Sequence, residues 1–309
     1  MQSIDILCVG EVLIDFIGHQ ENAQINTTRD YHRYLGGSPT NVAMNAARLG
    51  LKSSLVATVG EDGFGDYMTQ RLDEAGVGTA LIRRDPIHPS SVIFISKTSD
   101  TPEFIPYRSS DFLITENQVP DAILEHSKIF HTTCFALSKD PARSTILSKA
   151  KKAADMGCKT SIDVNYSEKL WDNVEEAFDA IRTYCELNPL VKISQDDMFR
   201  LFQKEISHGQ IFDFFHGIGV ETVCLTLGSK GVKLSSTHDG IIELPAKKVA
   251  RIKDATGAGD AFWSGFLYAY LNQKTTEECL DIALKLAALK LQNVGRLPDN
   301  INVLSKLLQ

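Results

Sequence analysis

The sequence has no apolar run long enough to cross a membrane. No stretch approaches the roughly 18 to 20 consecutive apolar residues that a membrane-spanning helix needs. The first segment, MQSIDILCVG, contains no basic residue, and Asp5 interrupts its apolar part, whereas a signal peptide has a basic start and a longer apolar run. We therefore expect a cytoplasmic protein with no membrane partner.

Closely spaced cysteines are also absent. The chain has six cysteines, but even the closest pair, Cys134 and Cys158, is too far apart for the CxxC spacing of zinc sites. All six lie in apolar segments, which is typical of reduced cysteines in a core. With 309 residues, 43% of them hydrophobic, the chain needs neither a disulfide nor a structural metal to bury a stable core.

Positive charge is in deficit. The 32 basic and 39 acidic residues give a formal net charge of −7, whereas nucleic-acid-binding proteins usually carry a basic patch or stripe. We therefore expect no nucleic-acid partner. The two common nucleotide-binding signatures are missing as well, since neither GxxxxGK[ST] nor a GxGxxG within a βαβ unit occurs.

The sequence does contain a regular alternation of short β-branched segments and longer amphipathic ones. We predict strands at Ile4–Val9, Ser54–Val59, Lys128–Thr132, Thr160–Val164, Leu190–Ile193 and Thr222–Leu227. We predict helices at Asn41–Leu49, Tyr67–Ala75, Ala142–Met156, Val174–Leu187 and Gln195–Phe202. This alternation predicts an α/β fold with a mostly parallel central sheet and helices on both faces.

Two segments interrupt the alternation. Residues from about Asp15 to Tyr34 and from about Ser90 to Tyr107 have alternating apolar positions with no helix between them. Val92, Phe94 and Phe104 are candidates for the apolar face of a small antiparallel sheet. Such a sheet would cover a site or mediate dimerisation, and plain surface hairpins are the alternative. No linker divides the sequence, so we predict one domain over residues 1–309 with an inserted lid.

The segment DATGAGDAFWSG, Asp254–Gly265, has the composition of an anion-binding helix start. Small residues at Gly257–Gly259 let backbone N–H groups converge on an anion, which the helix dipole also favours. Asp260 follows, and it would accept a proton from a hydroxyl held beside the anion; Ala261–Asn272 is apolar enough for a buried helix. These parts indicate phosphoryl transfer. The alternative is a glycine-rich turn in which Asp260 is an ordinary N-cap.

A second glycine segment lies far upstream. GGSPTN, Gly36–Asn41, opens a predicted helix, and Gly50 and Gly60 follow it. Two glycines permit close backbone approach to a polyhydroxyl ligand, and Asn41 offers both a donor and an acceptor. Taken alone, this segment is equally a capped turn.

Together the two segments resemble the signatures of the ribokinase-like (PfkB) family of carbohydrate and purine kinases. The first signature is matched by Gly36, Gly37, Asn41, Gly50 and Gly60, and the second, D-x-TGAGD, by Asp254, Thr256, Gly257, Ala258, Gly259 and Asp260. Intermediate segments match too, so the resemblance covers essentially the whole chain. It implies a ribokinase-like fold with a small β-sheet lid, and transfer of the γ-phosphate of ATP to a primary hydroxyl of a sugar.

The resemblance also implies roles for single residues. Asp260 is the implied catalytic base, and the amides of Gly257, Ala258 and Gly259 form the implied anion hole. Sugar-binding roles are implied for Asp15, which ends the G-x-x-x-x-D segment, and for Gly36, Gly37, Asn41, Arg108, Asp163 and Asn165. For Asp15 a plain loop or edge position is the alternative, and for Arg108 a solvated surface charge.

On the nucleotide side, LTLGSKG, Leu225–Gly231, resembles the strand and loop that contact ATP in this family. This implies ATP-binding roles for Thr226, Gly228, Ser229 and Gly231, together with Lys192. Asn293, in Asn293–Gly295, resembles the segment beside the adenine. Without the resemblance, the first segment would be a β-turn and the second a helix C-cap.

The same resemblance implies sites for two metal ions. Many relatives carry N-x-x-E, whose Glu orders water around Mg²⁺; here Ser194 and Asp197 take those positions, which implies that Asp197 holds Mg²⁺ through water. An ordinary helix start at Ser194 explains the same residues. Some relatives also bind a monovalent cation such as K⁺ beside the anion hole, and Asp254 and Thr256 would supply oxygens to it.

Three segments resemble the fructokinase and 2-keto-3-deoxygluconate kinase branch. They are Phe104–Arg108 with Asp111, Asp163–Tyr166 with Leu170–Trp171, and Ala136–Ser144. In the second, Ser167 takes the place of the usual Arg. A ketoacid would need paired cations, so fructose is favoured unless His131, Arg143 or Lys169 compensates.

Two other functions stay open: a 2-keto-3-deoxygluconate kinase, and a catalytically silent sugar-binding regulator on the same scaffold. The intact second signature argues against the regulator. Homodimerisation through the lid is a further expectation from the resemblance.

Overall fold

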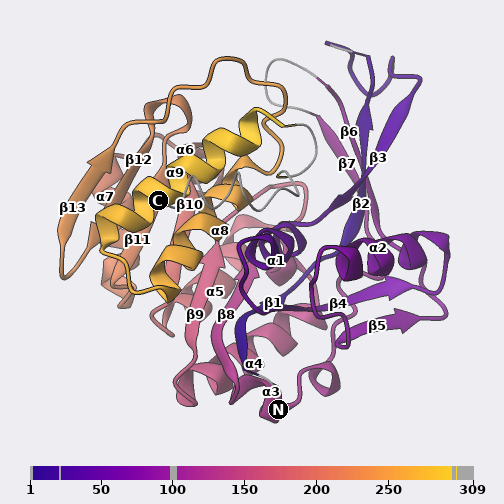
Figure 1. Cartoon of the computed structure of the whole chain (residues 1–309), viewed down its shortest axis with the longest axis horizontal. Coiled ribbons are helices and arrows are strands. Elements are labelled where there is room, and N and C mark those ends of the chain that lie inside the picture. Colours follow the sequence, from indigo (N-terminus) through magenta and orange to yellow (C-terminus); the bar gives the residue numbers. More distant parts are fainter. Residues whose placement is uncertain (1–2, 21, 98–102, 294–296, 298–309) are drawn as a thin grey trace.

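The computed structural model describes residues 3–20, 22–97, 103–293 and 297 of the chain. Its larger sheet has nine strands in the order β13-β12-β11-β10-β9-β8-β1-β4-β5 (Figure 1). The strands are β1 (Ile4–Val9), β4 (Ser53–Gly60), β5 (Ile82–Asp85), β8 (Ser127–Thr133), β9 (Lys159–Asp163), β10 (Leu190–Ser194), β11 (Thr222–Thr226), β12 (Val232–Ser236) and β13 (Gly240–Leu244). Neighbours from β11 to β5 run parallel, whereas β12 and β13 are joined antiparallel at one edge.

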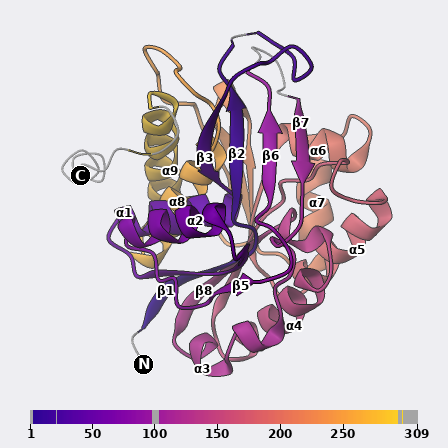
Figure 2. The same ribbon diagram turned by 90° about the vertical axis from the view of Figure 1, so that its right-hand side faces the viewer.

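Helices cover both faces of this sheet, and each face has its own apolar core (Figure 2). One face carries α1 (Ser38–Arg48), α2 (Gly63–Glu74), α8 (Ala258–Leu271) and α9 (Thr276–Leu291). The other carries α3 (Asp121–Leu124), α4 (Ala142–Asp155), α5 (Val174–Cys185), α6 (Gln195–Phe202) and α7 (His208–Ile218). The predicted α/β class is confirmed, and every predicted strand and helix is present. The elements not predicted are β5, α3, α7, α9 and the β12–β13 hairpin.

A second sheet of four strands, which we call the lid, stands at the upper end of the molecule (Figures 1 and 2). Its strands lie in the order β3-β2-β6-β7, with bounds β2 (Leu13–Gly18), β3 (Tyr31–Gly36), β6 (Val92–Ile95) and β7 (Phe104–Tyr107). The predicted sheet from these two segments is therefore present. The prediction that it is antiparallel is wrong for β2 and β6, which pair parallel with Asp15 opposite Ile93. Between them the chain passes through β3, α1, β4, α2 and β5, a crossover that returns it in the same direction.

All six cysteines are buried and unpaired, as predicted. Among the described residues, no helix has the length and apolar character to span a membrane.

Candidate active site

The start of α8 carries the residues of the second glycine signature. Gly257 is the N-cap, with φ of 72°, a left-handed conformation that glycine adopts without strain. The helix begins at Ala258, three residues before its predicted start, so Asp260 lies in its first turn. The alternative reading of Asp260 as an N-cap is therefore wrong.

The first-turn N–H groups of a helix have no partner within that helix. One of the three amides assigned to the anion hole is nonetheless engaged, because Ala258 N donates to Ala255 O at 3.1 Å. Anion binding at this amide would therefore compete with the turn that leads into α8.

Asp260 is held by two side chains from the start of α1. The Ser38 hydroxyl donates to Oδ1 at 2.7 Å, and Asn41 Nδ2 donates to Oδ2 at 2.8 Å. Helix α1 begins at Ser38 rather than at Asn41 as predicted, so both donors lie in its first turn. Burial raises the pKa of Asp260 above its usual value, although these two hydrogen bonds and the charges of Lys192 and Lys290 oppose the rise. A buried carboxylate with a raised pKa is suited to act as a general base.

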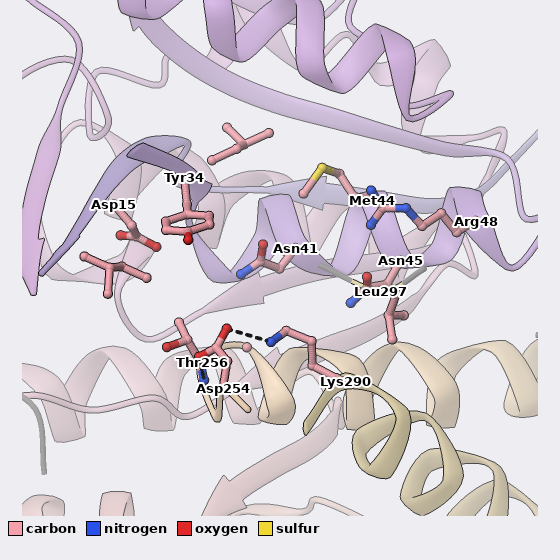
Figure 3. A pocket seen from close by; sticks show the side chains of 13 residues that line it. Asp15, Tyr34, Asn41, Met44, Asn45, Arg48, Asp254, Thr256, Lys290 and Leu297 are labelled. Atoms are coloured by element: carbon pink, nitrogen blue, oxygen red, sulfur yellow. Dashed lines mark hydrogen bonds and ion pairs between the residues drawn. The ribbon is translucent and has the colours of Figure 1, made fainter. Parts of the chain in front are cut away.

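The glycine pair before α1 brings Asp15 beside this carboxylate. A Cβ on Gly36 would lie 2.2 Å from Asp15 Oδ2, so only glycine leaves room for the Asp15 side chain against β3. Asp15 lies within β2, an inner strand of the lid, so the loop or edge alternative is wrong. It lines one cavity together with Asn41, Asp254 and Gly257 (Figure 3). Burial and the negative charges of Asp260 and Asp254 raise the pKa of Asp15 to about 7.

Glu11 is a buried residue near this site that was not predicted from the sequence. Its Oε1 accepts from Ser38 N and its Oε2 from Thr133 Oγ1, both at 3.0 Å. A Cβ on Gly37, whose φ is 102°, would lie 2.4 Å from Glu11 O. Burial raises the pKa of Glu11 to about 8. Glu11 thus ties the ends of β1 and β8 to the start of α1. The available signal was an acidic residue two positions after a strand whose last four residues are apolar.

The side chain of Lys192, on β10, lies against the first turn of α8. Its Nζ is 2.9 and 2.8 Å from the two carboxylate oxygens of Asp163, and both side chains are buried. A Cβ on Gly259 would lie 3.0 Å from Lys192 Nζ, so this glycine permits the ammonium to approach the first turn. Burial disfavours the charged ammonium, but the carboxylates of Asp163 and Asp197 outweigh it and raise the pKa of Lys192. The ammonium therefore stays charged beside the implied anion hole.

The remaining predicted sugar ligands are engaged with protein groups. Asp163 pairs with Lys192, and Asn165 Oδ1 accepts from Phe135 N at 3.0 Å. Arg108 forms an ion pair with Asp111 at 2.7 Å and lies 4.4 Å above the Phe135 ring. Its side chain is 5% exposed, so the alternative of a solvated surface charge is wrong.

A sequence model of the pfkB family carbohydrate kinases matches residues 3–300. The chain belongs to this family. An ATP-dependent 6-phosphofructokinase from Thermoanaerobacterium thermosaccharolyticum is 32% identical to this PfkB kinase, over 96% of this chain and 90% of its own. The structure of a fructokinase from Halothermothrix orenii is 32% identical with a TM-score of 0.82, over 92% of this chain and 98% of its own. The structure of an uncharacterized sugar kinase from Pyrococcus horikoshii in complex with ATP is 30% identical with a TM-score of 0.83, over 94% of this chain and 93% of its own.

The loop assigned to ATP in this PfkB kinase lies between β11 and β12. Thr226 ends β11 beside Ser194 of β10, and Gly228–Lys230 forms a single 3₁₀ turn. Gly231 has φ of 106°, and a Cβ there would lie 2.1 Å from Leu244 O, so its glycine is explained by packing against the end of β13. Ser229 lies within the turn and Gly228 begins it.

The segment assigned to the adenine lies after α9. Asn293 follows Gln292, which is the C-cap of the helix, and its Nδ2 donates to Leu289 O at 2.7 Å. Val294 and Gly295 lie outside the described residues.

Asp197 of this kinase caps its own helix. The Ser194 hydroxyl accepts from Asp197 N at 3.0 Å, and the Asp197 carboxylate accepts from Ser194 N at 3.3 Å and from Arg200 at 3.3 Å. The helix-start interpretation is therefore confirmed. Among residues that the structure describes, no group of three or more His, Cys, Asp or Glu side chains is arranged to hold a metal ion.

Proposed function

We propose that this PfkB kinase transfers the γ-phosphate of ATP to a primary hydroxyl of fructose. The observation that carries the proposal is the position of the Asp260 carboxylate. It lies in the first turn of α8 and accepts hydrogen bonds from Ser38 and Asn41 of α1. There a base and a group of helix N-terminal amides lie side by side, as phosphoryl transfer requires. The similarity to the fructokinase from H. orenii supports this substrate class.

In this mechanism the sugar binds between Asp15 on the lid and Asp260 on α8, beside Gly36, Gly37 and Asn41. Asp260 accepts the proton of the primary hydroxyl while that oxygen forms its bond to the γ-phosphorus, and ADP leaves with the electrons of the broken P–O bond. The amides of Gly257, Ala258 and Gly259 and the ammonium of Lys192 stabilise the charge on the transferring group. The proton remains on Asp260 until the phosphosugar leaves.

On the nucleotide side, ATP lies along the loop with Thr226, Gly228, Ser229 and Gly231 and reaches Asn293 with its base. It enters as its Mg²⁺ complex, and Mg²⁺ in such sites keeps several waters and takes few protein ligands. Asp197 lies at the carboxyl end of β10, where its carboxylate retains lone pairs for such a water. When bound, Mg²⁺ supplies charge neutralisation of the phosphates.

Neutral fructose is favoured over an anionic sugar because the cations near the site are already engaged. Arg143 donates to Leu137 O at 2.8 Å and pairs with Glu176 at 3.3 Å, and Lys169 Nζ donates to Phe104 O at 2.9 Å. His131 is fully buried, and burial lowers its pKa to about 3, so it is neutral. Arg108 and Lys192 are likewise paired, with Asp111 and Asp163. These groups therefore do not offer two unpaired cations to a carboxylate or a phosphate of the substrate.

The test is a coupled ADP-release assay on fructose, 2-keto-3-deoxygluconate and fructose 6-phosphate. We expect the highest kcat/KM with fructose, and an Asp260→Asn variant with kcat lower by about 10² to 10⁴-fold and sugar binding kept. A higher kcat/KM with the ketoacid would favour the alternative kinase. Binding of a sugar with no release of ADP in the presence of any of the sugars would favour the silent regulator. Near-normal turnover by Asp260→Asn would contradict the role of Asp260 as the base.

We also propose that residues 1–309 act as one domain, in the cytoplasm, whose lid pairs with the lid of a second copy. The outer face of the lid is aromatic: Phe94 stacks on Phe16 at 5.1 Å and contacts Tyr31 and Tyr107 edge-on. A groove of about 830 Å³ lies along this face. An exposed apolar sheet face of this kind is typical of protein interfaces.

A further inference from the structure

A lysine side chain lies beside Asp254, one of the two residues for which the family resemblance implies a monovalent cation. Lys290, in the last turn of α9, is 3% exposed, and its Nζ lies 3.1 Å from Asp254 Oδ2 and 3.2 Å from Asn293 O. Figure 3 shows it reaching across from α9 to Asp254, beside Thr256. The ammonium thus takes one carboxylate oxygen and one carbonyl oxygen, which are the ligand types of a hard cation.

Asp254 and Thr256 therefore do not fit a K⁺ ion in this chain. Asp254 Oδ1 accepts from Thr256 N at 2.9 Å, while Oδ2 accepts from Lys290. A second cation at these oxygens would lie within a few ångströms of the ammonium, where two like charges repel strongly because both are shielded from water.

The ammonium lies next to the anion-binding start of α8. A Cβ on Gly257, the N-cap, would be 3.8 Å from Lys290 Cε, and the charge of Lys290 lowers the pKa of Asp260 against the effect of burial. A positive charge at this place stabilises both the ionised base and an incoming phosphate.

Several carboxylates lie near Lys290, and their negative charge would repel a nucleotide unless a positive charge offsets it. Asp15 and Asp254 line one cavity with Lys290, and the Asp260 carboxylate lies close to it, at 3.7 Å from a Cβ on Gly257. Burial raises the pKa of Asp15, and the negative charges of Asp260 and Asp254 raise it further. Uncompensated, Asp254 would oppose binding of a polyanionic nucleotide, and Lys290 neutralises it.

The packing of α9 holds Lys290 in this position before any ligand arrives. Gly265 of α8 lies so close to α9 that a Cβ there would be 3.0 Å from Ala283 Cα. The segment before the signature is tied to the end of α9, because Lys253 N donates to Leu291 O at 2.8 Å. A fixed ammonium needs no ion to be recruited from solution.

We propose that the Lys290 ammonium replaces the monovalent cation beside the anion hole, so that this kinase works without K⁺. The inference rests on the proposed function for its activity readout only. Activity is measured in KCl, NaCl and tetramethylammonium chloride at equal ionic strength, with any sugar that supports turnover. We expect the wild type to differ by less than about twofold among the three salts, which screen charge equally.

The decisive variant is Lys290→Met, which keeps the aliphatic bulk and removes the charge. We expect its kcat/KM in tetramethylammonium chloride to fall by about 10² to 10³-fold, as for loss of one preorganised charge at a transition state, and K⁺ to restore a large part of it. Lys285→Met is the matched control on the same helix, since Lys285 pairs with Asp281 at the surface; it should respond to no salt.

A second readout does not depend on turnover. The melting temperature of Lys290→Met should rise with K⁺ and not with tetramethylammonium, whereas that of the wild type should respond equally to both. A wild type activated by K⁺ would overturn the proposal. A Lys290→Met variant that matches the wild type, or that is impaired without any effect of K⁺ on activity or melting, would overturn it too. If no sugar is turned over at all, the proposed function fails, and the melting experiment still decides this inference.

Discussion

At the scale of single residues, the feature that most determines the chemistry is the hydrogen bonding of Asp260. Its two oxygens accept from Ser38 and Asn41, which lie in another helix far away in the sequence. Both bonds favour the ionised carboxylate, whereas burial favours the protonated one. The contact between α1 and α8 therefore opposes the rise in the pKa of Asp260 that burial causes.

We predict that Ser38→Ala moves the acid limb of kcat/KM to higher pH by about one unit. A hydrogen bond to a charged group contributes roughly 1.5–3 kcal/mol, and one pKa unit corresponds to about 1.4 kcal/mol. Asp260 acts in its ionised form, so activity falls as pH drops through its pKa, and losing a donor raises that pKa. The measurement is the pH profile of kcat/KM.

Ser264→Ala is the matched control for this profile. Ser264 lies one turn further along α8, and its hydroxyl donates at 2.6 Å to the backbone carbonyl of Asp260 rather than to the carboxylate. The acid limb of the kcat/KM profile of Ser264→Ala should therefore lie at the same pH as that of the wild type. Equal profiles for Ser38→Ala and Ser264→Ala would contradict the role given to Ser38.

At the scale of elements, the close packing of α8 against α9 positions both the base and Lys290. Gly265 faces Ala283 so closely that a Cβ would also lie 3.3 Å from Ala283 N. Neither neighbouring atom is a flexible side chain, so the helices themselves would have to move apart.

We predict that Gly265→Ala lowers the free energy of unfolding by about 1–3 kcal/mol, the usual cost of overpacking. The control is Gly217→Ala in α7, where a Cβ would meet nothing within 4 Å and alanine should stabilise the helix by about 0.5–1 kcal/mol. Urea denaturation measures both. Equal stability of the two variants would show that α8 and α9 do not pack as closely as described.

At the scale of the whole molecule, part of the outer face of the lid is exposed, next to the place where Phe64 of α2 packs against Phe16. Tyr107 is 59% exposed on it and contacts Phe94. A second lid would bury these rings, whereas the helices of the α/β body already fill both faces of the larger sheet.

We predict a homodimer by light scattering, and a monomer for Tyr107→Glu, because a buried unpaired charge is costly at an interface. Ile241→Glu is the control: Ile241 is 62% exposed on β13, the edge strand of the larger sheet on the opposite side of the molecule from the lid (Figure 1), and its substitution should leave the dimer intact. A wild type that is monomeric at its assay concentration would refute the arrangement.

Much of the fold was predictable because its signals are local. Short β-branched segments marked six strands of the larger sheet, alternating apolar positions marked the lid, and the spacing of apolar residues marked five helices. Helix α9 was missed although it begins with a capping box at Thr275 and Glu278, and Glu11 was missed because a single charged residue after a strand carries no periodicity. The direction of β6 beside β2 was wrong because alternation determines which side chains share a face and not which way a strand runs.

The sequence by itself determined the two glycine signatures, and with them the backbone at the starts of α1 and α8, since the conformations of Gly37 and Gly257 depend on having no Cβ. Only the tertiary structure decided which side chains meet there. Asp260 with Ser38, Asp163 with Lys192, and Asp254 with Lys290 each join segments far apart in the chain. Such contacts depend on how helices and strands pack, and no local pattern encodes that packing. For this reason the sequence indicated Asp254 and Thr256 as oxygen donors, whereas the contact between Lys290 and Asp254 was found only in the tertiary structure.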